Sequence, residues 1–211
     1  MTPAMERSTD PSVKGSPVLG VVVTVRRHRT QGRISADQLS ARLAGAALDL
    51  VDQKIDIGRW YRVKDFTDLL DVDWDVGSRR DPEYMRRQGQ QAADRLFDSG
   101  IYQQLNYAER ADRVGSAREL KRQATLITTI TGTLYNFLRF EVRLAEGRGD
   151  ALEIVFSNAA PFSEALRYST EGFMNQINQR QGSKLQWSSR RERPDVVVFT
   201  LPLPSRFVAQ T

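Results

Sequence analysis

Cysteine is absent from this chain of 211 residues, and histidine occurs once, as His28. Without cysteine the chain has no disulfide, no thiolate metal site, no iron–sulfur cluster and no cysteine nucleophile. A metal site would depend on carboxylates around a single imidazole, and a serine nucleophile would need that same ring as its base. We therefore expect no metal, no cofactor and no enzymatic activity.

Long apolar runs are absent as well. No stretch approaches the roughly 20 apolar residues of a membrane span. The N-terminal residues MTPAMERSTDPSVKGSP lack the charged start and apolar core of a secretory signal, so we expect a cytoplasmic protein. Composition predicts a disordered tail over 1–16, a single domain over 17–203 and a second tail over 204–211.

The charge balance is basic, with a formal net charge of +5 and a pI near 9.7. Basic surfaces bind nucleic acids through counterion release, so a basic nucleic-acid-associated protein is one hypothesis. The basic residues are 26 arginines and five lysines, and they are scattered among acidic neighbours, as in RRDPEYMRRQ. This mixture makes nucleic-acid binding the alternative and not the leading hypothesis.

Several helices are predicted in the first half of the chain. The run VLGVVVTV at 18–25 favours a strand by propensity, although its periodicity fits a buried helix as well. Ser35 and Gln38 form a capping-box pattern that begins a helix over 36–53, and Asp81 with Pro82 begins another that ends before Gly100. The stretch DLLDVDWDVGSRRD lacks the glycine and terminal glutamate of a calcium loop and predicts a solvated acidic loop.

Trp60 and Tyr61 precede a short amphipathic helix whose apolar face includes Val63 and Phe66. They are ligand-pocket candidates, because aromatic side chains commonly line apolar pockets. An aromatic pair at a helix entrance more often fastens the incoming chain to the core. The structural interpretation is therefore favoured.

A long helix is predicted over 117–138, with an apolar arc broader than one sheet face requires. This breadth makes Ile127, Leu134 and Tyr135 interface candidates and predicts a homodimer or a heterodimer with a paralogue. Alternatively, the helix over 82–99 covers the remaining arc within one chain.

The last third of the chain alternates between strand and helix patterns. Period-two runs predict a hairpin over 139–156 and a second hairpin from KLQWSS to VVVFTL. Between them Pro161 opens a helix, and its stripe of Phe162, Leu166, Phe173 and Ile177 forms either one wall of an apolar ligand cavity or ordinary core. The predicted fold class is α+β, with N-terminal helices followed by a four-stranded antiparallel sheet packed on helices.

Three stretches carry a resemblance to a known family: VKGS at 13–16, RWY at 59–61 before a helix with DLL, and GTLYNFLRFEVRL at 132–144. In this order, with the late hairpin–helix–hairpin unit, the chain resembles a bacterial TRAPP-like family best represented by myxobacterial paralogues. That family lies near the heme-NO-binding and 4-vinyl-reductase-type sensor domains. The resemblance covers about residues 13–203 and implies a helix over 18–29.

The resemblance implies a non-enzymatic regulatory or scaffold module that holds an apolar small ligand and acts through a protein partner. A shared fold does not fix the function, and this chain departs from the characterised branches. Heme sensing needs an axial ligand beside the pocket, whereas His28 stands among Arg26, Arg27 and Arg29 in what we interpret as a solvated basic run. The cysteines of many 4-vinyl-reductase-type domains are missing too.

Overall fold

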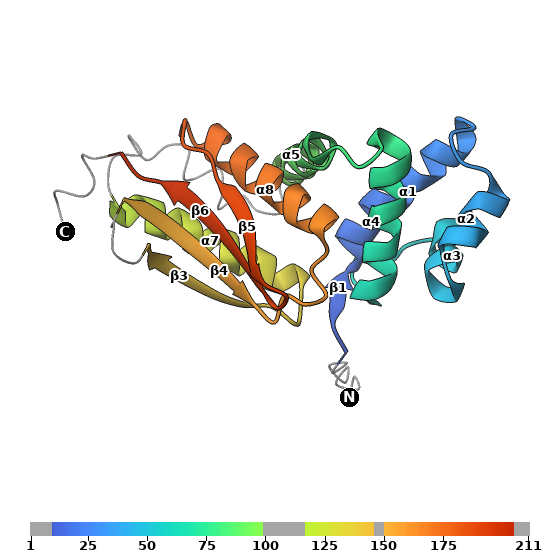
Figure 1. Ribbon diagram of the computed structural model, residues 1–211, viewed down its shortest axis with the longest axis horizontal. Coiled ribbons are helices and arrows are strands. Elements are labelled where there is room, and N and C mark those ends of the chain that lie inside the picture. The colour runs from blue at the N-terminus through green and yellow to red at the C-terminus, as the bar shows by residue number, and fades with distance from the viewer. Residues whose placement is uncertain (1–9, 99–116, 146–149, 205–211) are drawn as a thin grey trace.

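The computed structural model describes residues 10–98, 117–145 and 150–204. It is an α+β structure in which N-terminal helices precede a four-stranded antiparallel sheet, as the sequence predicts (Figure 1). Among the described helices, none is long and apolar enough to cross a membrane.

The first described element is a strand and not part of a tail. β1 (Ser12–Lys14) pairs with β2 (Trp60–Arg62), and the Val13 side chain is fully buried. The expected tail boundary at residue 16 is therefore wrong, because Ser12, Val13 and Lys14 supply the backbone partner that β2 needs. The run at 18–25 belongs to a helix, α1 (Gly15–Thr30), so the strand interpretation is wrong and the implied helix is confirmed.

The predicted helix over 36–53 is divided in two. α2 (Ala36–Arg42) begins with the expected Ser35–Gln38 capping box, and α3 (Gly45–Asp52) follows after a break. The break occurs because Leu43 and Ala44 adopt extended backbone angles, which turns the Leu43 side chain into the core. The next helix, α4 (Val63–Ser78), includes the acidic stretch that the sequence assigned to a loop.

The second half of the chain forms the sheet and its helices. The first predicted hairpin is confirmed, whereas the second has its first strand at Ser188–Arg193, four residues later than the predicted KLQWSS. The helix between the hairpins starts at Glu164 with Ser163 as its cap, a turn later than Pro161 indicates. The remaining elements are α5 (Pro82–Asp98), α7 (Ala117–Leu134), β3 (Arg139–Leu144), β4 (Ala151–Ser157), α8 (Glu164–Arg180), β5 (Ser188–Arg193) and β6 (Val196–Pro202).

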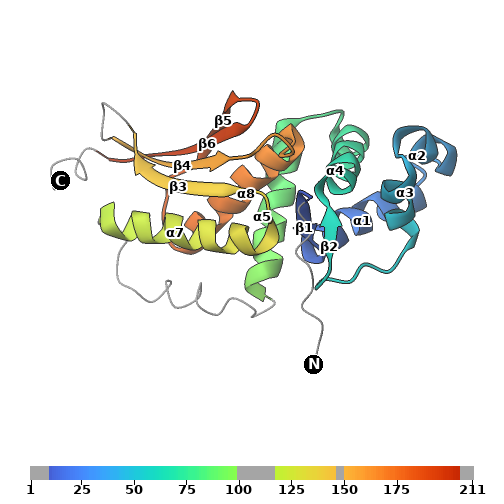
Figure 2. The ribbon, with the colours of Figure 1, turned by 90° about the horizontal axis from the view of Figure 1, so that it is seen from below.

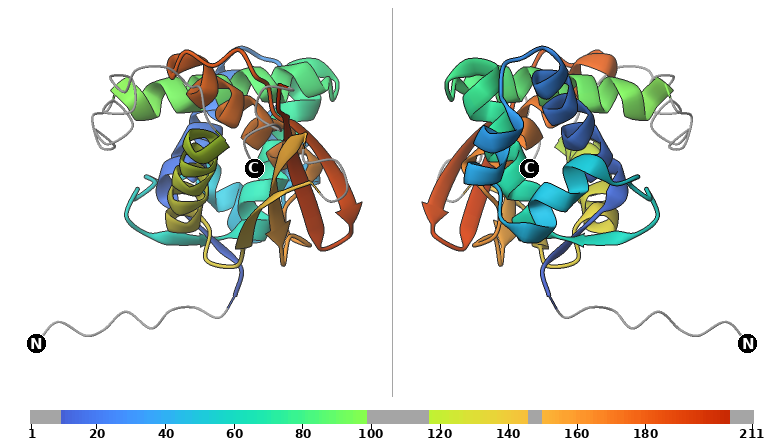
Figure 3. Two further views of the ribbon diagram at one scale, coloured as in Figure 1. Left: turned by 90° about the vertical axis from the view of Figure 1, so that its left-hand side faces the viewer. Right: turned by 90° about the vertical axis from the view of Figure 1, so that its right-hand side faces the viewer.

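The strand order in the sheet is β3-β4-β6-β5, and all neighbours are antiparallel. Figure 2 shows α7 and α8 on one face of the sheet, with α1 to α4 grouped beside them. We call α1 to α4 with β1 and β2 the helical half, and the sheet with α7 and α8 the sheet half. α5 lies against α8 and runs across the direction of α7 (Figures 2 and 3).

Two glycines allow α5 and α8 to approach closely. A Cβ added to Gly89 would lie 1.8 Å from the Ser169 carbonyl oxygen, and one added to Gly172 would lie 2.0 Å from the Arg86 carbonyl oxygen. The backbones of the two helices are therefore in direct contact. Beside this crossing Arg86 Nε donates to the buried Glu171 carboxylate at 2.5 Å, which joins the same two helices electrostatically.

We expect Gly89→Ala to lower the free energy of unfolding by at least ~2 kcal/mol, because its methyl group would overlap rigid backbone. Gly20→Ala on α1 is the matched control, since the nearest atom to its added Cβ is the end of the Arg95 side chain at 3.9 Å. The control should gain about 0.5–1 kcal/mol from helix propensity. Equal urea-denaturation midpoints for the two variants would contradict the close crossing.

Candidate functional site

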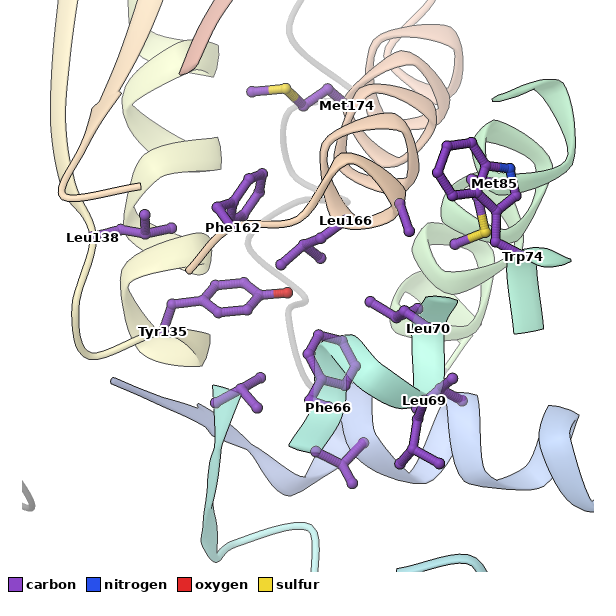
Figure 4. Close-up of a cluster of buried hydrophobic side chains, with 14 of the residues drawn as sticks. Phe66, Leu69, Leu70, Trp74, Met85, Tyr135, Leu138, Phe162, Leu166 and Met174 are labelled. Carbon is purple, nitrogen blue, oxygen red and sulfur yellow. The ribbon is translucent and has the colours of Figure 1, made fainter. Parts of the chain in front are cut away.

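An apolar cluster joins the helical half to the sheet half (Figure 4). Phe66 and Leu70 lie one turn apart on α4, so both side chains project from the same helix face. Opposite them are Tyr135, which follows α7, Phe162, which precedes α8, and Leu166 on α8 (Figure 4). All five are buried, so the cluster is the interior seam between the two halves.

Tyr135 places a polar group inside this seam. Its ring packs edge-on against Phe137 and Phe162, with centroid distances of 6.0 and 6.1 Å. Figure 4 shows its hydroxyl directed toward Phe66, Leu70 and Leu166. The side chain is only 7% exposed.

Burial raises the pKa of Tyr135, so the phenol stays neutral and keeps its proton for donation. A hydroxyl of this kind is able to donate a hydrogen bond to a small acceptor that enters the seam. This is the chemical reason to treat the seam as the candidate ligand site.

The backbone around Tyr135 is fixed by the N-terminal strand. Val13 forms an isolated antiparallel bridge with Tyr135. The Asn136 side chain accepts from the Ser12 backbone N–H at 2.7 Å and donates to the Asp10 carbonyl at 3.1 Å. β1 therefore connects the end of α7 with the helical half and sets the position of the tyrosine ring.

A second polar group of interest lies within the helical half. His28 on α1 and Asp73 on α4 are both nearly inaccessible, and His28 Nε2 lies 2.9 Å from Asp73 Oδ1. The Tyr84 hydroxyl, from α5, donates to the same oxygen at 2.7 Å. His28 Nδ1 is buried with no hydrogen-bond partner. One carboxylate thus holds three helices together, and one ring nitrogen is unsatisfied.

The electrostatics of this trio are governed by burial. Burial raises the pKa of Asp73, although the hydrogen bonds from Tyr84 and His28 and the nearby Arg27 act in the opposite direction. Burial also raises the pKa of Tyr84, and its hydrogen bond to Asp73 adds to that shift. Tyr84 therefore acts as a neutral donor.

Two predictions about this region are wrong. His28 is not part of a solvated basic run, because it continues the buried stripe of α1 after Val21 and Val25 at helical spacing. Asp73 is not in a solvated loop, because α4 continues through the acidic stretch and turns this one carboxylate inward. The spacing of His28 from the valines was the signal that could have revealed its burial.

Trp60 and Tyr61 lie away from the seam, on β2. Both are partly buried; Lys14 Nζ lies 4.3 Å from the centre of the Trp60 ring, and the Tyr61 hydroxyl accepts from the Asp56 backbone N–H. Of the other pocket candidates, Phe162 and Leu166 belong to the seam, and Ile177 is buried farther along α8. Phe173 is partly buried at the side of the core.

The interface candidates have partners within the chain. Ile127 and Tyr135 are buried, with exposures of 1% and 7%, and Leu134 is partly buried against the same core. The dimer through this helix stays a prediction, but it would have to use surface other than Ile127 and Tyr135.

Comparison with solved structures identifies a fold of known type. The chain resembles an H-NOX protein from K. algicida with 13% identity and a TM-score of 0.60, covering 91% of this chain and 97% of that one. It resembles an H-NOX protein from S. oneidensis with 14% identity and a TM-score of 0.54, covering 91% and 99%. A mutant H-NOX from T. tengcongensis matches with 12% identity and a TM-score of 0.53, covering 90% and 96%.

This likeness defines the fold as H-NOX-like. No protein-family model matches the sequence, and no curated protein matches it. The similarity to the heme-NO-binding domains named by the sequence resemblance is thus found at the level of structure.

A heme, as named for the H-NOX family, would have no histidine or cysteine ligand beside the seam. His28 is the only histidine and there is no cysteine, and the His28 imidazole is buried within the helical half, where it and Tyr84 of α5 share the Asp73 carboxylate. A tyrosine ligates heme iron in some proteins, but burial raises the pKa of Tyr84 and of Tyr135 and keeps both protonated. Among the described residues, no three histidine, aspartate or glutamate side chains gather as metal ligands.

We expect the purified chain to show no Soret band of histidine-ligated heme after reconstitution with hemin, because the one imidazole is buried between helices α1, α4 and α5. His28→Gln, which keeps a polar side chain of similar size, is the control. A Soret band that is present in the natural chain and lost in His28→Gln would contradict this expectation.

Asp73→Asn tests the buried carboxyl. Because burial raises the pKa of Asp73 above its ordinary 3.8, the folded chain binds this proton more tightly than the unfolded chain. The resulting stabilisation is complete below that ordinary value and is lost as pH rises through the raised folded-state pKa. The stability of Asp73→Asn relative to the natural chain should therefore increase as the pH rises from about 4.

Denaturant midpoints at several pH values measure this trend, with the exposed Asp49→Asn on α3 as control. A relative stability that falls with rising pH would show that the hydrogen bonds from Tyr84 and His28 outweigh burial.

Proposed function

We propose that the chain is a non-enzymatic regulatory module that binds a small, largely apolar ligand in the seam between its two halves. The observation that carries this proposal is the Tyr135 hydroxyl, a neutral donor directed among the apolar side chains of the seam. Apolar walls with one or two polar groups are typical of small-molecule sites. The H-NOX-like fold supports a sensor role by analogy alone.

The position of the seam explains how binding would produce a signal. Phe66 and Leu70 belong to the helical half, whereas Phe162 and Leu166 belong to the sheet half. A ligand between them would alter the packing of one half on the other, and a protein partner would detect that change. The TRAPP-like resemblance also supports a role that depends on a partner.

Nucleic-acid binding is not favoured by the arrangement of charge. Many arginines are neutralised by carboxylates of the same chain: Arg29, Arg42, Arg80, Arg86, Arg143, Arg167, Arg180, Arg190 and Arg191. Phosphate contacts would have to compete with these pairs.

Native mass spectrometry of the freshly purified protein tests the ligand proposal. We expect a bound small molecule in the natural chain and an adduct weakened about five- to tenfold in Tyr135→Phe, which removes one hydrogen bond. Tyr61→Phe is the matched control, because its hydroxyl lies outside the seam and is engaged by Asp56.

Tyr135→Phe should fold about as stably as the natural chain, because it keeps the aromatic ring and its packing against Phe137 and Phe162. A natural chain that carries only its own mass, or an adduct unaffected by Tyr135→Phe, would contradict the proposal.

A further inference from the structure

Strand β3 forms one edge of the sheet. It pairs with β4 through six consecutive residues, and its other side has no strand partner among the described residues. Its sequence RFEVRL contains no proline, and its register with β4 has no bulge. An edge of this kind offers backbone N–H and C=O groups that another strand is able to pair with.

The opposite edge, β5, is protected in a way that β3 is not. Its sequence SSRRER carries three arginines and one glutamate, so two copies of β5 would repel one another. Its register with β6 is also interrupted between Arg191 and Arg193. Charge and a bulge are the usual devices that prevent edge pairing.

β3 leaves apolar surface uncovered. Phe140, Val142 and Leu144 alternate along one side of the strand, paired with the buried Phe156, Ile154 and Leu152 of β4. Phe140 and Val142 are only partly buried, and Leu144 is 43% exposed. A further strand beside β3 would cover all three.

Two registers with a two-fold axis pair five residues of β3, and in one of them the strand is complementary to itself. With a two-fold axis at Val142, antiparallel pairing places Glu141 opposite Arg143 of the second copy and Phe140 opposite Leu144. With the axis at Glu141, the two Glu141 carboxylates face each other and Arg139 faces Arg143. Opposite charges across strands attract and like charges repel, so the first register is favoured.

We propose that two copies of this chain associate through their β3 edges, antiparallel about a two-fold axis at Val142. The two four-stranded sheets then form one continuous sheet. Arg143 also binds Glu153 of its own chain at 3.2 Å, and its side chain keeps 33% exposure, so it is able to face a second carboxylate. This interface does not depend on a ligand in the seam.

Single-cysteine cross-linking tests the register, because the natural chain has no cysteine. At the axis, residue 142 of one copy lies directly opposite residue 142 of the other, within the reach of a disulfide. Val142→Cys should therefore give a covalent dimer under mild oxidation. Glu141→Cys and Ser188→Cys, on β3 and β5, should give only the background level.

Sedimentation equilibrium of chains without cysteine tests the association itself. An interface made of one pair of short strands is small, so we expect a dissociation constant in roughly the micromolar range. Glu141→Arg should raise this constant about tenfold, because the two Glu141–Arg143 pairs become repulsive. Asp49→Arg makes the same charge change on exposed α3 and should leave it unchanged. Circular dichroism melts confirm that each variant folds.

Three results would overturn the proposal. The first is a natural chain that stays monomeric up to about 300 μM, well above the range expected for such an interface. The second is cross-linking of Glu141→Cys or Ser188→Cys as efficient as that of Val142→Cys. The third is a dimer that Glu141→Arg does not weaken.

Discussion

The contact between α5 and α8 is the constraint on which the rest of the structure depends. Gly89 and Gly172 bring the two backbones together, and no other residue type would allow that distance. From this crossing Arg86 reaches Glu171, whose carboxylate also accepts from Ser189 on β5. One helix crossing thereby connects α5 to the edge of the sheet.

α5 is also connected to the helical half, through Tyr84. Its hydroxyl binds the carboxylate of Asp73 on α4, which also pairs with His28 on α1. α5 is therefore shared between two sets of contacts, one made of close backbone packing and one of buried hydrogen bonds. By holding α5 from both sides, these two sets of contacts fix how closely Phe66 and Leu70 of α4 approach Phe162 and Leu166 of the sheet half.

The sequence predicts an element well when the residues that stabilise it are neighbours along the chain, and poorly when they are far apart along it. The first hairpin and the Ser35 cap depend on neighbouring residues, so local patterns are sufficient for them. The sequence misplaces β1 and His28, because their burial is decided by residues far along the chain, namely Tyr61 and Tyr135 for β1 and Asp73 for His28. Phe162 and Leu166 were predicted as pocket candidates from one stripe, but the seam also needs Tyr135 and Phe66, which no local pattern connects to it.

The junction between β1 and Asn136 has a consequence for how the chain folds during synthesis. The hydrogen bond from Ser12 to Asn136 joins residues separated by 124 positions. Because a ribosome releases the chain from its N-terminus, α1 to α4 emerge long before the residues that complete the environment of β1. During that interval β1 has β2 as its partner but exposes the surface that later meets Tyr135. Closing the seam is thus a late, long-range step, and the nascent helical half has to persist with an open apolar side until α7 and its C-terminal turn have been made.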